Sequence, residues 1–201
     1  LKPILVDSDL MTWNMDTEEI IKKISKKTKA IIVVHLGGMP ADMISIMAYA
    51  KKRNIKVIED CSQAHGAKIG KSYAGSFGDI AVWSFCNDKI MSTLGEGGMI
   101  SCKSNMLYKK LWAYKDCGKN IDKIKKGSKN KLFKWIHDYD GTNLRMTEIQ
   151  AAVGIEQLKN LNSMVNKRFN NLKILKKRIK NKNVVIPEYP KNILHAGYRF
   201  Y

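Results

Sequence analysis

The chain has 201 residues, 44% of them hydrophobic, which is enough for one domain, or a domain and part of another, with a sizeable core. It carries 36 Lys and Arg against 18 Asp and Glu, a formal net charge of +18. Arginine occurs only at positions 53, 145, 168, 178 and 199. Because arginine is the residue that best recognises bases and phosphates, this lysine-dominated excess favours a solvated lysine surface over a nucleic-acid-binding module. Such a surface would still attract small anionic substrates.

Neither a membrane span nor an oxidised disulfide framework is expected. No run approaches the roughly 18 consecutive apolar residues that cross a bilayer, and the first residues, "LKPILVDSDLMTW", lack the apolar core and cleavage site of a secretion signal. The cysteines are Cys61, Cys86, Cys102 and Cys117, and they form no CxxC pair. We therefore expect reduced thiols in a cytoplasmic protein and assign no metal ligands.

Short apolar runs alternate with amphipathic segments over the first 60 residues. This alternation, with short connections, predicts a right-handed parallel α/β sheet, and such sheets bind ligands at the carboxyl ends of their strands. The expected elements are a strand at 3–7, a helix from Asp16, a strand at 29–36, a helix at 42–53 and a strand at 55–60.

The second half begins with two more expected strands, at 79–85 and 97–103, followed by a helix at 104–117. The segment 118–134 is polar and lysine-rich without an apolar period, so we expect a surface loop. A capping-box pattern, Thr147 to Gln150, predicts the start of a long helix that extends to about residue 182. Its apolar stripe, at spacings of three or four, comprises Leu158, Leu161, Val165, Phe169, Leu172 and Leu175.

The chain then enters "VVIPEYP" and stops at "HAGYRFY", within what we predict to be another strand. We expect three parts: residues 1–145 in a large domain, 146–182 as a linking helix, and 183–201 as the start of a small C-terminal domain. Both ends look cut, so we expect the sequence to be part of a longer protein.

Chemically distinctive residues follow the third and fourth apolar runs. Asp60 ends a buried strand, where an unpaired carboxylate is rare, and Lys89 lies just after the next strand in glycine-rich, apolar surroundings. Ser84, Asn87 and the turn "LGEGG" supply hydroxyl, amide and backbone donors for a phosphate. A nucleophilic lysine, a carboxylate for a pyridinium nitrogen and phosphate donors are together what pyridoxal phosphate requires.

Several long motifs in the chain resemble the DegT/DnrJ/StrS sugar aminotransferases, which are fold-type I pyridoxal-phosphate enzymes. They are "TKAIIVVHLGGMPADM", "VIEDCSQAHGAKIGKSYAGSFGDIAVWSF", "SFCNDKIMSTLGEGGMI" and "DGTNLRMTEIQAAVGIEQLKNL", in the family's order. The resemblance implies the large domain of an aspartate-aminotransferase-like fold, a mostly parallel sheet flanked by helices, and a homodimer.

The resemblance also implies roles for five residues. Lys89 would form the Schiff base with pyridoxal 5'-phosphate and then move the proton between cofactor and substrate carbons. Asp60 would pair with the protonated pyridine nitrogen, Gln63 would contact the ring or its phenolic oxygen, and Ser84 would hold the phosphate. Asn143 would reach the phosphate of the neighbouring subunit, so that each active site needs two chains.

Several residues keep a simpler interpretation. Lys89 could be an ordinary loop lysine, Asp60 a turn cap, and Gln63 or Ser84 a partner of backbone groups. We expect His65 to be hydrogen-bonded in the wall of the site. Separately from these, Glu96 is expected to face solvent or the dimer partner, while His35, His195 and Arg199 could contact substrate or simply pack.

Some features depart from the family. The N-terminal glycine, serine or threonine turn and the aromatic that stacks on the cofactor have no counterpart here, and Gly197 stands where an aromatic is commoner. A sister branch that dehydrates sugars carries histidine in place of the lysine, so Lys89 favours transamination.

The expected function is transfer of an amino group, from glutamate, to a nucleotide-linked keto-deoxysugar for surface polysaccharide or glycoconjugate synthesis. Alternatives are a same-fold enzyme acting on a cyclitol or another keto sugar, a non-catalytic regulator that binds pyridoxal phosphate, and a basic polyanion-binding module. No helix-turn-helix or RNA-binding motif supports the last.

Overall fold

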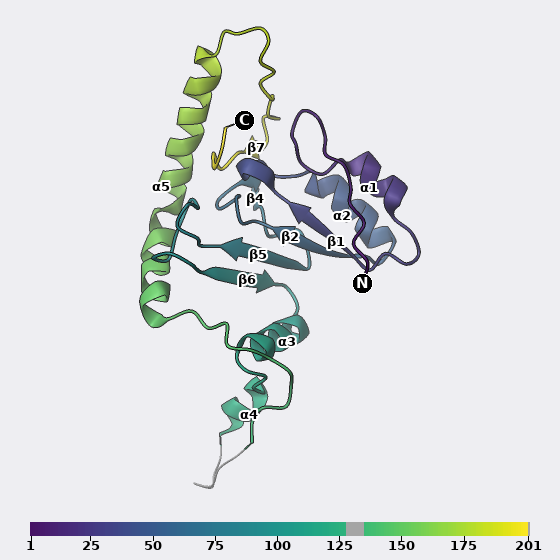
Figure 1. The fold of residues 1–201 in the computed structure, drawn as a ribbon, viewed down its shortest axis with the longest axis vertical. Coiled ribbons are helices and arrows are strands. Elements are labelled where there is room, and N and C mark those ends of the chain that lie inside the picture. The colour runs from purple at the N-terminus through teal and green to yellow at the C-terminus, as the bar shows by residue number, and fades with distance from the viewer. Residues whose placement is uncertain (128–134, 201) are drawn as a thin grey trace.

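The computed structural model describes residues 1–127 and 135–200, and its centre is a mixed β-sheet (Figure 1). Within these residues the strands β1 (Ala30–Val34), β2 (Lys56–Asp60), β5 (Ile80–Ser84) and β6 (Gly98–Cys102) lie in the order β1-β2-β5-β6. The first three are parallel and β6 is antiparallel to β5. The prediction of a mostly parallel α/β sheet is confirmed.

Two helices pack against one face of this sheet. The helix α1 (Thr17–Lys23) begins after the predicted Asp16, whose carboxylate accepts from two first-turn amides. The helix α2 (Met43–Lys52) is capped by Asp42, which accepts the N–H of Ser45. Alternate strand residues point toward these helices because side chains alternate across a strand. The core formed there comprises Ile20, Ile31, Val33, Ala41, Met43, Ile46, Ala50, Ile55 and Val57.

The opposite face of the sheet is largely uncovered in the described residues. Ile32 is 59% exposed, and Val34 and Ile100 are exposed as well. The strand register places Val34, Asp60, Val82 and Ile100 in one row, so Asp60 lies on this face. Two residues beyond Val82, Ser84 lies on the same face at the carboxyl end of β5.

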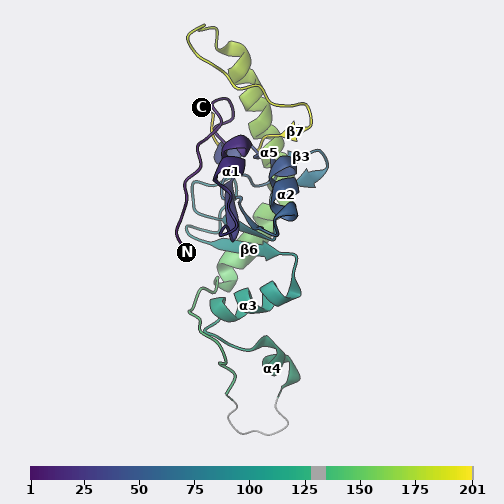
Figure 2. The same ribbon diagram turned by 90° about the vertical axis from the view of Figure 1, so that its right-hand side faces the viewer.

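The remaining elements surround the sheet. A 3-10 turn, η1 (Leu36–Gly38), follows β1, and the short strands β3 (Lys68–Ile69), β4 (Ser72–Tyr73) and β7 (Ile193–Leu194) form a small antiparallel sheet. The helices α3 (Asn105–Lys115) and α4 (Ile121–Lys126) extend from the molecule beyond β6, as Figures 1 and 2 both show. No helix in the described residues is long and apolar enough to cross a membrane.

The long helix α5 (Glu148–Arg178) runs past the strand ends that carry the lysine loop (Figure 1). The predicted capping box is confirmed, with Thr147 and Gln150 each bonding the other's backbone. Of the predicted stripe, Val165 and Leu172 are buried. Leu158 and Leu175 are exposed in the described structure.

Some predicted elements were wrong or incomplete. Residues 3–7 form no strand: Leu5 is 85% exposed, and an apolar run becomes a strand only where a partner strand offers its hydrogen bonds. The expected loop at 118–134 contains α4, which Asn120 caps, while 128–134 lie outside the described residues. The long helix ends at Arg178 rather than near 182. The domain boundaries at 145 and 182 stay predictions.

Candidate active site

Asp60 is the last residue of β2, and its carboxylate has one oxygen already engaged. Oδ1 accepts the backbone N–H of Ser62 at 2.9 Å, which holds the side chain at the strand end. Oδ2 has no hydrogen bond within the described parts of the chain. An anionic oxygen is therefore open to a cationic or N–H partner on the uncovered face of the sheet.

Ser84 stands at the equivalent end of the neighbouring strand. Its Oγ accepts the backbone N–H of Cys86 at 3.3 Å, so its hydroxyl proton can be donated to an anionic oxygen. The chain then forms the loop that carries Lys89 and returns as β6.

The lysine loop, residues 86–97, is anchored at both ends and from α5. Phe85 and Gly97 share a backbone hydrogen bond of 2.8 Å, and Thr93 N–H bonds to the carbonyl of Phe85 at 3.2 Å. From α5, Gln150 Nε2 donates to the carbonyl of Glu96 at 2.7 Å. The Glu96 side chain is exposed, as expected, and its Oε1 accepts from the Cys86 thiol at 3.3 Å. The loop is thus fixed by elements distant in the sequence.

Lys89 is not an ordinary surface lysine. Its side chain is only 16% exposed, and the next residue, Ile90, lies in a second buried cluster. Its Nζ lies 3.4 Å from the Tyr198 hydroxyl and 3.8 Å from Asp88 Oδ1. The side chain of this lysine is therefore largely covered by the fold, and its amine lies beside Tyr198 and Asp88.

Gln63 joins the turn after β1 to the segment after β2. Its Oε1 accepts the N–H of Gly37 at 2.6 Å, which leaves its amide NH2 group as the donor for a ligand. Residues 195–199 lie against the same turn, because Ala196 N–H bonds to Gly38 at 2.8 Å and Arg199 N–H to Gly37 at 3.0 Å. The C-terminal segment thereby meets the strand ends and brings Tyr198 to Lys89.

Asn143 lies in a different part of the chain from these residues. Its Oδ1 accepts from Arg145 Nε at 3.1 Å, and its backbone pairs with Asp116 at the end of α3. Asp116 itself forms ion pairs with Lys119 and Arg145. The hydrogen bond from Lys119 is the largest cause that lowers the pKa of the Asp116 carboxyl, and the positive charges of Lys119 and Arg145 lower it further. The structure thus groups Asp60, Gln63, Ser84 and Lys89, while the role of Asn143 toward a neighbouring subunit stays a prediction.

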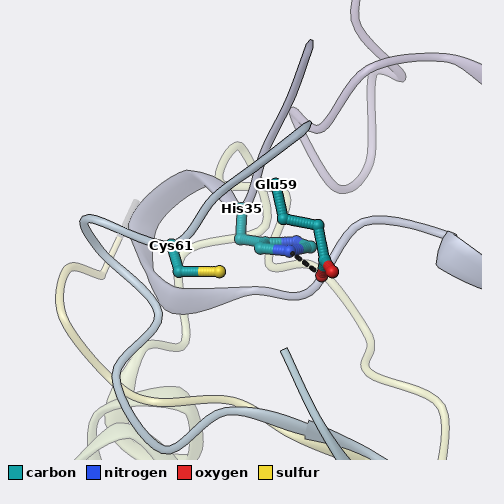
Figure 3. Close-up of side chains that lie close together, drawn as sticks. All are labelled: His35, Glu59 and Cys61. Atoms are coloured by element: carbon teal, nitrogen blue, oxygen red, sulfur yellow. Dashed lines mark hydrogen bonds and ion pairs between the residues drawn. The ribbon is translucent and has the colours of Figure 1, made fainter. Parts of the chain in front are cut away.

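A buried brace lies on the opposite face of the sheet from Asp60, because Glu59 precedes Asp60 in β2 and side chains alternate across a strand. Figure 3 shows its two side chains, Glu59 and His35. Glu59 accepts from His35 Nε2 at 3.0 Å and from the backbone N–H groups of Gly75, Phe77 and Gly78. His35 Nδ1 in turn accepts the N–H of Ala41 at 3.0 Å. Burial alone would raise the pKa of the Glu59 carboxyl. The hydrogen bonds outweigh this effect, so the pKa of Glu59 is lowered.

Cys61 lies beside this pair, and together the three side chains have the composition of a metal site. Burial raises the pKa of the Cys61 thiol, so it stays protonated at neutral pH. Both ring nitrogens of His35 and both oxygens of Glu59 already have protein partners. We therefore interpret the group as a structural brace that fixes the turns after β1 and before β5, and His35 as packed rather than facing substrate.

The other histidines of interest are buried too. His65 lies between the rings of Trp83 and Phe85, with centroids at 5.6 and 5.9 Å. The prediction of a hydrogen-bonded His65 was wrong, since neither ring nitrogen has a partner within the described residues. His195 is packed against Tyr189, and its Nδ1 accepts the N–H of Gly197 at 2.8 Å.

Sequence reasoning missed Tyr198, Asp88 and the Glu59–His35 brace. Tyr198 and Lys89 are 109 positions apart, and no periodicity connects them. The only signal for Glu59 was a second acidic residue at the end of a buried strand, beside the Asp60 that the motif singled out.

The residues at the carboxyl ends of β2 and β5 fit pyridoxal phosphate. An open carboxylate oxygen at Asp60 suits a protonated ring nitrogen, the Ser84 hydroxyl suits a phosphate oxygen, and the enclosed amine of Lys89 suits an aldehyde carbon. All three functional groups lie at the carboxyl ends of the strands of one sheet, which is where α/β folds bind ligands.

The chain is similar in sequence to several curated proteins. The chain is 40% identical over 194 residues to the GDP-perosamine synthase of Escherichia coli O157:H7, covering 96% of this chain and 50% of that protein. It is 38% identical over 198 residues to the dTDP-3-amino-3,6-dideoxy-alpha-D-galactopyranose transaminase of Aneurinibacillus thermoaerophilus, with 98% and 51% covered. The chain spans about half the length of these curated relatives.

A solved structure, the aminotransferase from Psychrobacter cryohalolentis, superposes with a TM-score of 0.91 at 41% identity, covering 98% of this chain and 52% of that one. Residues 1–200 match the DegT/DnrJ/EryC1/StrS aminotransferase family throughout, which confirms the resemblance found in the motifs. The chain belongs to the DegT/DnrJ/EryC1/StrS aminotransferase family.

Proposed function

We propose that the protein containing this chain is a pyridoxal-phosphate-dependent aminotransferase that transfers an amino group from glutamate to the keto carbon of a nucleotide-linked deoxysugar. The observation that carries the proposal is the enclosed amine of Lys89, at the strand edge that also carries Asp60 and Ser84. The names of the two curated relatives, a GDP-sugar synthase and a dTDP-sugar transaminase, support the substrate class. A product of this kind would enter surface polysaccharide or glycoconjugate synthesis.

The cofactor supplies an aldehyde that exchanges amines and a ring that withdraws electrons from the reacting carbon. Asp60 keeps that withdrawal strong, because its open Oδ2 would stabilise a proton on the ring nitrogen. Ser84 would donate to the phosphate, and the free NH2 end of Gln63 would donate to a ring oxygen. These three residues bind and orient, and they move no proton.

Lys89 is the residue that would move the proton. Its amine would hold the cofactor through the aldehyde between turnovers and, when free, would take a proton from one carbon and return it to another. Donor and acceptor would use the site in turn, which is the ping-pong pattern of covalent catalysis. We also propose that Asn143 reaches the phosphate bound by a second copy of the chain, which makes the active unit a dimer.

The test is the visible absorbance of the full-length protein with pyridoxal phosphate, before and after addition of glutamate. We expect a cofactor band that is absent from Lys89→Ala and that glutamate bleaches in the unmodified protein. The matched control is Lys68→Ala, which removes another lysine that stands over a tyrosine ring but lies on the small sheet. This control should keep the band.

The other outcomes separate the alternatives. A band that needs Lys89 but ignores glutamate would favour another donor or a regulator that binds the cofactor without turnover. Amino transfer to a cyclitol in preference to a nucleotide-linked keto sugar would change the substrate class and leave the roles of the residues intact. Normal turnover by Lys89→Ala would refute the assignment.

A further inference from the structure

A chain of polar contacts leads from Lys89 to an aspartate through a tyrosine from the far end of the sequence. Lys89 Nζ lies 3.4 Å from the Tyr198 hydroxyl, which lies 2.5 Å from Asp88 Oδ2. The carboxylate of Asp88 can only accept, so the Tyr198 proton goes to Asp88 and the tyrosine oxygen accepts from the Lys89 amine. The direction of each hydrogen bond is therefore fixed by the chemistry of the groups.

The Tyr198 backbone is placed independently of this contact. Its neighbours Ala196 and Arg199 donate to Gly38 and Gly37 at the end of β1, at 2.8 and 3.0 Å. Gly197 has φ of +67°, and a Cβ there would come within 2.9 Å of Arg168 Cβ on α5. Only glycine at position 197 lets the segment lie against α5 and deliver Tyr198 to Lys89.

The packing of Tyr198 needs its ring but not its hydroxyl. The ring packs against a buried cluster that includes Ile90 and Ala196, and Lys89 stands 5.0 Å from the ring centroid. The hydroxyl instead lies between an amine and a carboxylate. The hydrogen bond from Tyr198 is the largest cause that lowers the pKa of Asp88, which is thus an anion at neutral pH.

The charged groups around this point alternate in sign. Lys89 Nζ lies 3.8 Å from Asp88 Oδ1, and Arg199 lies 4.0 Å from Asp88 Oδ2 on the more exposed side. Asp88 is half exposed, so its direct attraction for Lys89 is screened by solvent. The rigidly placed hydroxyl of Tyr198 is the better determinant of where the amine sits.

We propose that Tyr198, oriented by Asp88, is a positioning residue that holds the free amine of Lys89 at the strand edge whenever that amine is not attached to the cofactor. This inference rests on the proposed function, in which Lys89 is released and bound again in each half-reaction. A free lysine side chain has four rotatable bonds and therefore a large rotamer entropy. A fixed hydrogen-bond acceptor restricts the Lys89 amine to conformations near the reactive position. Catalysis gains from such proximity because less entropy is lost when the groups react.

The first test needs no cofactor. In the full-length apo-protein, reductive methylation by formaldehyde and cyanoborohydride, followed by peptide mass spectrometry, gives the rate at which Lys89 reacts. We expect Tyr198→Phe to react about fivefold faster at Lys89, the factor that corresponds to loss of one hydrogen bond. The control is Tyr73→Phe. Lys68 Nζ lies 4.2 Å from the centroid of the Tyr73 ring, so this lysine contacts the ring rather than the hydroxyl that the substitution removes. Methylation of Lys68 should not change in it.

The second test uses glutamate turnover in the holoenzyme. Tyr198→Phe should lower kcat about fivefold and leave the KM for glutamate within about twofold, since the hydroxyl acts on Lys89 rather than on the substrate. Asp88→Asn keeps an acceptor for the Tyr198 proton, so it should retain more activity than Asp88→Ala. A purely structural role would not separate the two aspartate variants or split kcat from KM.

The outcomes distinguish this inference from the proposed function. An unchanged Lys89 methylation rate in Tyr198→Phe would overturn the inference, and so would equal kcat in Tyr198→Phe and the unmodified protein. In either case the proposed function stands if the unmodified protein consumes glutamate. If the unmodified protein forms no cofactor band, the proposed function and the role in turnover both fail, whatever the methylation rate.

Discussion

The buried His65 should make folding stability depend on pH in a range where carboxylates contribute little. Its side chain is 1% exposed, and burial, the largest cause, lowers its pKa to about 4. The charge of Lys89 acts in the same direction, and together they outweigh the opposing effect of the Ser84 backbone. The folded protein therefore keeps this ring neutral where an unfolded chain would protonate it.

The sign and the size follow from linkage. Above pH 6.5, the ordinary histidine value, both states hold His65 neutral and its contribution is complete. As the pH falls from 6.5 toward about 4, only the unfolded state takes up the proton, so the free energy of unfolding falls by about 1.4 kcal/mol per pH unit. Between pH 7 and pH 5 the loss from this residue is about 2 kcal/mol.

The assay is urea unfolding of the full-length protein and of His65→Leu at pH 7 and pH 5. Leucine fills a similar volume among Trp83 and Phe85 and cannot be protonated. His195, whose pKa burial also lowers to about 4, is present in both proteins and cancels in the comparison. We expect the unmodified protein to lose about 2 kcal/mol more than the variant over this range. Equal losses in the two proteins, or a His65 ring that titrates near pH 6.5 by NMR, would refute the reasoning.

Three further changes test the brace, the packing of α5 and the cofactor partner. Glu59→Gln places an NH2 group among backbone donors and should lower the free energy of unfolding, measured with urea, by about 3 kcal/mol. An unchanged free energy of unfolding would show that the brace does not stabilise the fold. Gly66→Ala should cost about 2 kcal/mol, because φ is +77° and its Cβ would lie 2.8 Å from Val165 Cγ2; a melting temperature equal to that of the unmodified protein would contradict this. Asp60→Asn keeps the size of the side chain but loses its charge and should weaken pyridoxal phosphate binding about tenfold or more, measured by absorbance titration, whereas equal affinity would show that Asp60 faces no cation.

Much of the fold was predictable because its signals are local. The strands β1 and β5 are largely apolar runs, and helices α1 and α5 begin after Asp16 and Thr147, whose side chains satisfy the first free N–H groups. That Asp60, Ser84 and Lys89 would lie at one edge of the sheet was predictable for a related reason, since parallel strands present their carboxyl ends at one edge.

The wrong strand prediction at 3–7 has a physical cause, which is that a strand needs a partner. Residues 3–7 have the apolar composition of a strand but no neighbouring edge within the described chain. The sequence also could not show that β6 runs antiparallel to β5, because the pattern of a buried strand is the same in both directions.

By itself, then, the sequence determined the α/β class, the family and the edge of the sheet where the chemistry lies, because these follow from periodicity, caps and long motifs. Only the tertiary structure decided how neighbouring residues divide their tasks. Glu59 and Asp60 are adjacent, yet alternation across β2 directs one carboxylate into a buried brace and leaves the other open to a ligand. It is likewise the packing of residues 195–199 on η1 and α5 that sets Tyr198 beside Lys89, a contact that no local pattern encodes.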